Sequence, residues 1–295
     1  MNSKTLGIVA VVLVAVFAVA AYAAISGDDG GNGNDGDEKG TAHAVTLNGV
    51  EAVDSNIVNG TYDIKRNLVL VTKGAPEGNV AAFLSWVTSE EGQEVLGKEF
   101  VKLPSYTMET APERSSKTTI SLGGSTSLSE TADALAAAYM AKYGFMTITV
   151  QGGGSGAGEK QCDAGVFDIG MLSRDMSAKY EDSLVPICIG QDGVAVIVNV
   201  AGVTDLTTEQ VAKIFNGTYM NWNQVGGPDR SIQVISREDG SGTRECFDNV
   251  MKGCVDGWSL LDHCVSCPST GQVIDNVQST DGSIGYISIG QVSRV

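Results

Sequence analysis

Residues 119–159 read TISLGGSTSLSETADALAAAYMAKYGFMTITVQGGGSGAGE, and this stretch decides the fold. Short apolar runs predict strands, and apolar residues that recur at helical spacing predict a helix between them. A loop of Gly, Ser and Thr follows each strand. Strands that alternate with helices are typical of an α/β fold with a mostly parallel sheet. The expected elements are strands at 119–122 and 146–150, loops at 123–127 and 152–158, and helices over 128–143 and from Glu159.

A third unit of the same kind lies further along the chain. A strand at 232–235 leads into the loop Asp239-Gly240-Ser241-Gly242-Thr243, and a helix is expected over 244–251. Elsewhere the pattern predicts a buried strand at 68–71, a helix over 78–96 and an irregular surface connection at 105–117.

Loops that join a strand to a helix through Gly, Ser and Thr are suited to bind anions. Glycine lets the backbone approach a ligand closely, and the first N–H groups of a helix point outward at the positive end of its dipole. A single loop of this kind is more often an ordinary helix cap. Three in one chain, at the carboxyl ends of strands, favour a shared ligand site.

The ligand is expected to be small and to lack a base. Residues 152–160 lack the Gly-Lys-Ser/Thr ending of a P-loop, and 154–158 do not have the spacing of a dinucleotide fingerprint. Arg237, just before the third loop, could hold an oxyanion with two parallel hydrogen bonds, and Asp239 could orient it. The alternative for Arg237 is a surface salt bridge.

The first residues of the chain predict export. Residues 6–25 are apolar, Ala, Gly or Tyr over a length that can span a bilayer, and 21–23 read as a cleavage site. We expect a retained membrane anchor, and a secreted chain cleaved after Ala23 is the alternative. The predicted domains are an anchor at 1–26, a flexible acidic Gly-rich linker at 27–43 and a folded extracytoplasmic domain at 44–295.

The formal net charge of −16 argues against nucleic acid and anionic membrane surfaces as partners. An acidic protein can still bind an anion where local donors and dipoles outweigh its overall field.

The chain has six cysteines, and an even number in an exported chain predicts disulfides. One alternative is a zinc site formed by Cys254, His263, Cys264 and Cys267, and another is a redox pair at the C-x-x-C of 264–267. The disulfide candidates are Cys162, Cys188, Cys246, Cys254, Cys264 and Cys267.

Several ordered motifs cover nearly all of the chain after the linker. They are GSTS (124–127), QGGGSGAG (151–158), DIGMLSR (168–174), FNGTY (215–219) with Asn221-Trp222, SREDGSGT (236–243) and GSIGY (282–286). Together they resemble the substrate-binding proteins of ABC phosphate importers. The resemblance implies an α/β fold of two lobes around a ligand cleft, the type 2 periplasmic-binding-protein or Venus flytrap fold.

The order of the segments differs from that of the family. Residues 45–103 resemble the family's carboxyl-terminal part through LNGV (47–50), NGTY (59–62), TKG (72–74) and SEEGQ (89–93), whereas residues from Thr118 on resemble its beginning. We interpret this as a circular permutation in which 105–117 joins the family's old termini. The competing interpretation is a fragment of a tandem array. The permuted lobes would be about 67–192, and about 193–295 together with 44–66.

The resemblance also implies the ligand-binding residues. Ser173 stands where some relatives place an Asp that accepts the proton of phosphate and so discriminates phosphate from sulfate, and a Ser hydroxyl can also accept this proton. Expected phosphate ligands are Thr126, Ser127, Ser155, Ser173, Arg237, Ser241, Gly242 and Thr243, supported by Ser125, Gly154, Gly156, Arg174 and Asp239.

The resemblance therefore implies a membrane-tethered receptor that delivers inorganic phosphate to the permease subunits of an ABC importer. We expect a monomer with no cofactor and no catalytic residue. One alternative is that the ligand is another oxyanion, such as sulfate or molybdate. Another is that the protein senses phosphate at the cell surface and takes no part in transport. A phosphate-ester hydrolase is disfavoured because the only histidines are His43 and His263 and no Asp/His metal cluster stands out.

Overall fold

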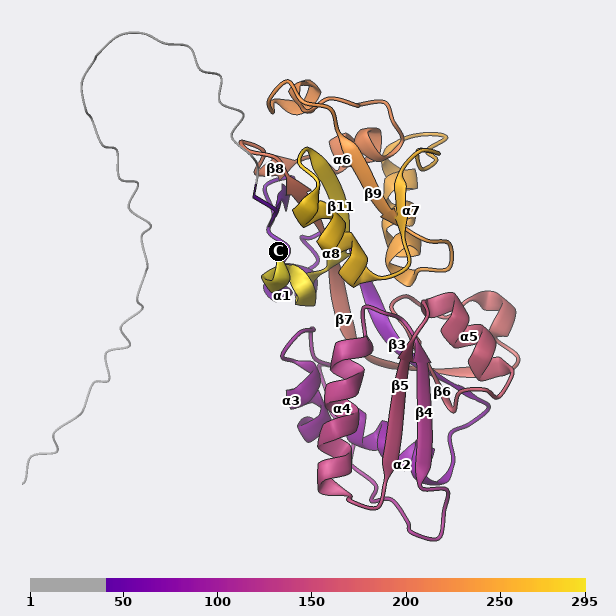
Figure 1. Ribbon diagram of the computed structural model, residues 1–295. Helices are drawn as coiled ribbons and strands as arrows, with labels where there is room; N and C mark the ends of the chain where they lie inside the picture. Colours follow the sequence, from indigo (N-terminus) through magenta and orange to yellow (C-terminus); the bar gives the residue numbers. More distant parts are fainter. Residues whose placement is uncertain (1–40) are drawn as a thin grey trace, which may run out of the picture. The chain divides into compact units, whose positions relative to one another are not determined.

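A computed structural model describes residues 41–295 (Figure 1). The predicted anchor, its cleavage site and most of the predicted linker lie outside these residues. The first strand, β1 (His43–Ala44), begins at the last residue of the stretch expected to be linker. Within 41–295, no helix combines the length and the apolar character needed to cross a membrane.

One nine-stranded sheet organises the structure, in the order β10-β9-β11-β7-β3-β6-β4-β5, with β1 paired to β7. A separate parallel pair joins β2 to β8. The bounds are β2 Thr46–Leu47, β3 Lys65–Lys73, β4 Thr119–Gly124, β5 Thr147–Gly152, β6 Ile169–Leu172, β7 Leu184–Asn199, β8 Asp205–Leu206, β9 Gln233–Arg237, β10 Val265–Cys267 and β11 Ser283–Ser288.

The sheet is mixed, which corrects the expectation of a mostly parallel one. The strand–loop–helix units do pair in parallel, as β4 with β5 and β6, and as β9 with β10 and β11. The strands between these groups are antiparallel, because β3 pairs with β6 and β7, and β7 pairs with β11. The loops that were expected to bind an anion thus follow parallel strands on either side of an antiparallel centre.

Two long strands join the two groups. The first ten residues of β7, 184–193, run beside β3, and residues 194–199 continue beside β11 and β1 (Figure 1). We call β4, β5 and β6 with helices α2–α5 the β4 half, and β9, β10 and β11 with α6–α8 the β11 half. The two halves are therefore connected through β3 and β7.

The β4 half is built around Phe83, Trp86 and Tyr139, whose rings contact one another at centroid distances of 5.1 to 6.4 Å. The single helix predicted over 78–96 is two helices. The chain turns at Ser89, whose side chain accepts a hydrogen bond from Gly92 N and caps the second helix. The helices are α2 Gly78–Val87, α3 Glu90–Leu96, α4 Ser129–Lys142 and α5 Ser155–Asp163.

The β11 half has its own core. Phe247 and Tyr286 stack at 4.1 Å between centroids, and Phe215 lies against both. Residues from the start of the domain, including Val45 and Tyr62, belong to the same cluster. Its helices are α6 Thr208–Phe215, α7 Gly242–Cys254 and α8 Thr270–Ser279, and α1 Asp54–Val58 packs on the same core through Ile57. The 3-10 helices Trp222–Val225 and Ile289–Arg294 also contact this core, whereas the 3-10 helix Ala178–Tyr180 follows β6 and packs elsewhere.

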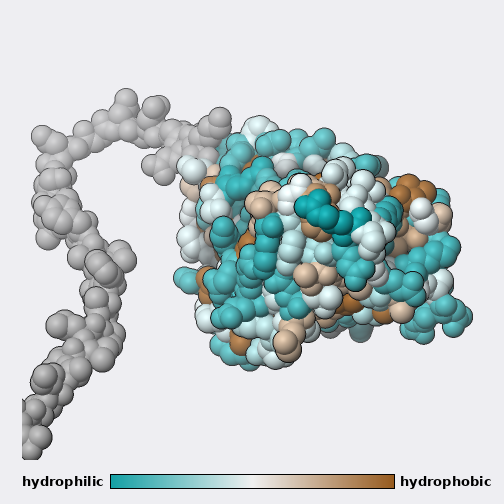
Figure 2. Space-filling view, turned by 90° about the horizontal axis from the view of Figure 1, so that it is seen from below, coloured by the Kyte–Doolittle hydropathy of each residue, from teal (hydrophilic) through white to brown (hydrophobic). Residues whose placement is uncertain are grey.

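The connection at 105–117 is irregular and mainly exposed, as predicted. Figure 2 views one face of the molecule, on which hydrophobic residues are scattered among hydrophilic ones. Large exposed hydrophobic residues are few among residues 41–295, and Met108 in this connection is one of them at 92% exposed.

The six cysteines are free thiols, so the structure contradicts the disulfide prediction. Cys246 and Cys254 lie on the same helix, α7, and the two buried cysteines, Cys162 and Cys267, have other partners. Cys162 Sγ donates to Val71 O at 3.4 Å, and Cys267 Sγ accepts from Asn276 Nδ2 at 3.2 Å. The sequence shows that the number of cysteines is even, but it does not show which thiols lie close enough to pair.

A buried ion pair fixes α5 against the segment that follows β6. Glu159 is fully buried and receives Arg174 Nη1 at 2.7 Å and Nη2 at 2.8 Å, together with the backbone N–H of Ser177. Burial alone would raise the pKa of Glu159, but the hydrogen bonds from Arg174 and Ser177 outweigh it and hold the pKa below its usual value.

The variant Glu159→Gln should lose about 3 kcal/mol of unfolding free energy at pH 7, because Arg174 then loses its buried counter-charge. Because the pKa of Glu159 is lower in the folded chain, its ionised form stabilises the fold at pH values above its unfolded pKa of about 4.3. This stabilisation is lost as the pH falls through the folded pKa. Denaturant unfolding at pH 7 and at about pH 3.5 should therefore show a difference that shrinks in acid. Glu181→Gln, at an exposed position, is the control. An equal loss at both pH values would mean that packing, not charge, holds α5.

Thiol titration of the unfolded full-length chain without reductant should find all six cysteines free. Burial raises the pKa of Cys246 to about 11, so this half-buried thiol should react more slowly in the folded chain than after unfolding. Fewer than six free thiols, or a mass gain on reduction and alkylation beyond that of the unreduced chain, would restore the disulfide prediction.

Candidate anion-binding site

Four loop–helix junctions meet between the β4 and β11 halves. The loop 125–127 precedes α4, and α5, α7 and α8 begin at Ser155, Gly242 and Thr270. Ser127 Oγ lies 2.9 Å from Thr243 Oγ1 and 3.3 Å from Thr270 Oγ1. The junctions predicted from sequence are thus brought together, and α8 adds one that was not predicted.

Arg237, at the end of β9, is buried and reaches both halves. Its Nη2 donates to Thr126 Oγ1 at 3.1 Å in the β4 half, and its Nη1 donates to Thr270 Oγ1 at 3.0 Å in the β11 half. Its Nε donates to Glu238 Oε2 at 2.9 Å. The guanidinium therefore sits among hydroxyl groups and is no surface salt bridge.

Glu238, not Asp239, orients Arg237, which corrects the role expected of Asp239. The Asp239 side chain is 96% exposed and pairs with Arg244 at 2.7 Å. Two adjacent acids follow the arginine, and the sequence alone does not say which one turns inward. The turn at Gly240, with φ of 86°, directs Asp239 outward.

The second loop and α7 approach each other closely. Ser173 N donates to Ser155 Oγ at 3.1 Å, and the two hydroxyl oxygens lie 3.3 Å apart. A Cβ on Gly242 would lie 2.4 Å from Ser155 Oγ and 2.8 Å from Ser173 Oγ. Only glycine fits at position 242, so the start of α7 faces these two serines directly.

The remaining predicted residues cap and support the loops. Ser241 Oγ accepts from Arg244 N at 3.3 Å and caps α7. Gly154 N donates to Gly124 O at 2.9 Å within the β4 half, while Gly156 N donates to Gly240 O at 3.0 Å across the halves. The amides of both glycines are therefore used within the protein and hold the loops in place.

Ser125 is a buried residue of the first loop whose hydroxyl has no hydrogen-bond partner among residues 41–295. An unsatisfied buried hydroxyl costs about 1–3 kcal/mol. An oxyanion held beside this loop would give the hydroxyl an acceptor.

Arg174 lies beside the site and pairs with two carboxylates, those of Glu159 and Glu245. Besides its bonds to Glu159, its Nε lies 2.7 Å from Glu245 Oε2 on α7, an ion pair whose angle is not that of a hydrogen bond. Arg174 thus connects the β4 half to α7.

Arg66 is a site residue that sequence reasoning missed. It is buried on β3, where its Nη2 and Nε donate to Asp192 Oδ2 at 2.6 and 3.0 Å, and its Nη1 donates to Thr243 Oγ1 at 2.7 Å. Burial raises the pKa of Asp192, and Arg66 and Ser288 oppose the shift. In the sequence, Arg66 is marked only as an Arg before an apolar strand. Its partners, Asp192 and Thr243, lie far along the chain and cannot be recognised from the sequence.

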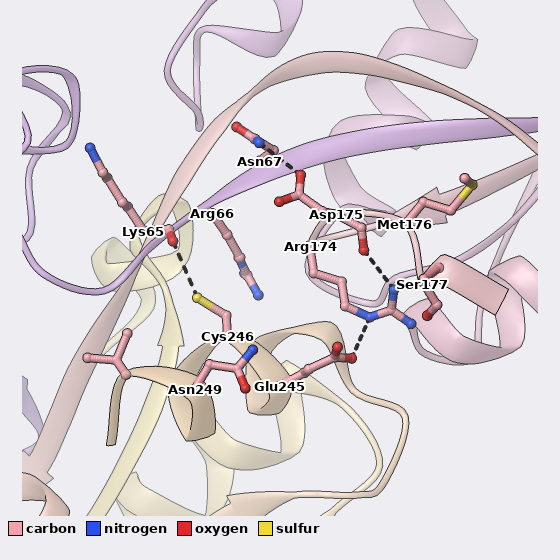
Figure 3. A pocket seen from close by; sticks show the side chains of 12 residues that line it. Lys65, Arg66, Asn67, Arg174, Asp175, Met176, Ser177, Glu245, Cys246 and Asn249 are labelled. Carbon is pink, nitrogen blue, oxygen red and sulfur yellow. Dashed lines mark hydrogen bonds and ion pairs between the residues drawn. The ribbon is translucent and has the colours of Figure 1, made fainter. Parts of the chain in front are cut away.

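A cavity of about 400 Å³ opens beside the site, between β3, the segment after β6 and α7 (Figure 3). Arg66, Arg174 and Glu245 line it, and Cys246 lies on its α7 side. The expected phosphate ligands other than Thr126 are almost fully shielded from solvent, as Ser155 and Ser173 illustrate at 0% and 1% exposed. The halves are therefore closed around the hydroxyl groups in this structure.

No group of three His, Cys, Asp or Glu residues is placed to hold a metal ion in the part of the chain that the structure describes. The four residues of the alternative zinc site do not form such a group. The thiols of Cys264 and Cys267 are free.

Comparisons with known proteins show which proteins the chain is similar to. The chain is 30% identical over 187 residues to the phosphate-binding protein PstS of Bacillus subtilis (strain 168), a match that covers 61% of this chain and 60% of that protein. A PstS 2 protein of Streptococcus pneumoniae TIGR4 is 30% identical over 185 residues, covering 62% and 63%. The chain thus spans about three fifths of the length of these relatives.

Two solved structures are also similar. A phosphate-binding protein of a phosphate ABC transporter from Streptococcus pneumoniae TIGR4 has a TM-score of 0.54 at 28% identity, covering 62% of this chain and 72% of that one. A Clostridium perfringens substrate-binding protein with bound phosphate has a TM-score of 0.52 at 33% identity, covering 58% and 70%. Residues 109–294 match the model of the PBP superfamily domain. This match covers more than half of the 295 residues of the chain, and the chain therefore belongs to the PBP superfamily.

Proposed function

We propose that this chain is an extracytoplasmic binding protein that captures inorganic phosphate between two lobes and delivers it to an ABC importer. The observation that supports this most strongly is Arg237, whose buried guanidinium joins hydroxyl groups of both halves. Relatives at about 30% identity are named phosphate-binding proteins, and a similar structure contains phosphate. The predicted segment at 6–25 would tether the protein to the membrane.

The two lobes of the proposal are about 67–192, and about 193–295 with 44–66. Two separate core clusters support this division, one holding Phe83 and Tyr139 and the other Phe247 and Tyr286. The hinge would be the paired strands β3 and β7, because they connect the halves. Ligand exchange requires opening, since the site is shielded from solvent when the halves meet.

In the closed form, the anion and direct contacts between the two halves would both stabilise closure. These contacts include the Gly156–Gly240 backbone hydrogen bond, the Arg174–Glu245 pair and Arg294 Nη1 at 2.9 Å from Glu130 Oε1. The exposed Arg294–Glu130 ion pair contributes about 0–1 kcal/mol. The anion would supply most of the closing free energy, because hydrogen bonds to a charged group are worth about 1.5–3 kcal/mol each.

We further propose that the chain is circularly permuted relative to the family. The family match begins at residue 109, as expected if 45–103 corresponds to a segment at the other end of the relatives. Ala44 and Val295 pack against the same hydrophobic cluster, so the two ends of the domain lie near each other. Residues within 44–66 belong to the same core cluster as residues from 194 to 286, which favours permutation over a fragment of a tandem array.

Reordering the chain tests the permutation. A protein with residues 118–295 followed by 44–104 should fold as a monomer and bind phosphate within about threefold of the original order, since the site contacts do not depend on the connection at 105–117. Circular dichroism, light scattering and calorimetry measure this. An unfolded or aggregated product would contradict the proposal.

Calorimetry of the full-length chain in detergent should find that phosphate and arsenate bind and that sulfate binds far more weakly. The neutral hydroxyl groups, Ser173 among them, can accept the proton that phosphate carries and sulfate lacks. Equal affinity for sulfate would refute the phosphate assignment while leaving an oxyanion site. Titration with molybdate tests the remaining alternative.

Arg237→Ala should weaken phosphate binding by about 100-fold or more, because the anion loses a buried charged donor and two threonine hydroxyls lose their partner. Arg114→Ala is the matched control, since Arg114 lies over the Phe145 ring in another part of the chain. Unchanged affinity in Arg237→Ala would mean that the third loop is structural.

A further inference from the structure

Two buried guanidinium groups bond to three threonine hydroxyls in the site. Arg237 donates to Thr126 and Thr270, and Arg66 donates to Thr243. Ser127 Oγ lies between Thr243 and Thr270, at 2.9 and 3.3 Å. We call Thr126, Ser127, Thr243 and Thr270 the hydroxyl cluster.

An arginine can only donate hydrogen bonds, and it stays charged in proteins. A hydroxyl oxygen that accepts from a guanidinium places its negative end toward that charge, so its own proton points away. Thr126, Thr243 and Thr270 are therefore turned into donors that face the rest of the cluster. Such donors suit an oxyanion, because bonds to a charged acceptor are stronger than bonds between neutral groups.

Arg66 is itself held at the hinge. It is the register partner of Asp192 across β3 and β7, and Asp192 Oδ2 also accepts from Ser288 Oγ at 2.8 Å. From this anchor the Arg66 side chain extends toward α7, as Figure 3 shows. The strands that join the halves thus fix the direction of one hydroxyl at the start of α7.

Thr270 is buried at the first position of α8, a helix of 10 residues. Its hydroxyl accepts from Arg237 and lies near Ser127 of the opposite half. It thereby occupies the same setting as Thr243, which the family resemblance includes among the ligand residues.

We propose that Thr270 binds the oxyanion directly and that Arg66 is a positioning residue, which acts on the ligand by fixing Thr243 as a donor. This deepens the proposed function and rests on it. The two arginines play matching parts, because each is held by a carboxylate. Arg66 orients one threonine hydroxyl, and Arg237 orients two.

The Thr270 half of the proposal is tested with inorganic phosphate and the full-length chain. Thr270→Val removes the hydroxyl at nearly constant shape and should weaken phosphate binding by about 10- to 100-fold in calorimetry. Thr270→Ser should recover most of the affinity. Thr131→Val is the control, since Thr131 is also buried but bonds to Glu99 away from the cluster. If Thr270→Val binds phosphate as tightly as the unaltered chain, Thr270 is structural.

The Arg66 half is tested by a double-mutant cycle with Thr243. Arg66→Lys keeps the charge beside Asp192 but cannot reach both partners in the same way, and we expect about tenfold weaker phosphate binding. In a Thr243→Val background, Arg66→Lys should change affinity by less than about twofold, because its effect passes through that hydroxyl. An equal loss in both backgrounds would overturn the positioning role.

A second variant covers the case in which Arg66→Lys does not fold. Replacing the pair together, as Arg66→Met with Asp192→Leu, leaves no unpaired buried charge. It should show the same loss of affinity as Arg66→Lys, and unaltered affinity would overturn the proposal. If the unaltered chain does not bind phosphate at all, the proposed function fails. If it binds and these variants bind equally well, only the present inference fails.

Discussion

The closed arrangement depends on the buried guanidinium of Arg237. This group joins a hydroxyl of the first loop to a hydroxyl at the start of α8, and these belong to opposite halves of the sheet. A buried charge is tolerated only when it is paired and hydrogen-bonded. Glu238 supplies the pair, and Thr126, Thr270 and the Cys267 carbonyl supply the other acceptors. Opening the halves would deprive Arg237 of the partner on the β4 half.

This arrangement explains how a protein with a net charge of −16 could hold an anion. Both arginines of the site are paired with carboxylates, so the site is nearly neutral and acts through oriented dipoles. Hydroxyl groups and helix starts provide donors without adding charge. Because the site is almost fully shielded from solvent, these dipoles are screened less than they would be at the surface.

The sequence predicted the local units of the site better than their surroundings. Ser127, Ser155 and Thr243 stand in strand–loop–helix patterns that can be recognised within a few residues. Arg66 and Thr270 were not found in this way, because they are identified by contacts with other elements. Arg66 bonds to Thr243, 177 residues away, and Thr270 contacts Arg237 and Ser127, 33 and 143 residues away.

The other errors have similar causes. The helix predicted over 78–96 is interrupted because Ser89 caps a new helix, which apolar spacing does not show. The sheet is mixed because β3 pairs antiparallel with β7. The disulfide prediction was wrong because it rested on the number of cysteines alone. Local patterns specify short elements, whereas long-range pairing decides which elements and thiols meet.

The central claim is that one tetrahedral anion is held by donors of both halves. A crystal structure of the chain grown with phosphate tests it most directly. We expect phosphate within hydrogen-bond distance of Arg237 and of hydroxyls from each half, Ser127 and Thr243 among them. Phosphate bound to one half alone, or only in the cavity beside Arg66 and Arg174, would contradict it.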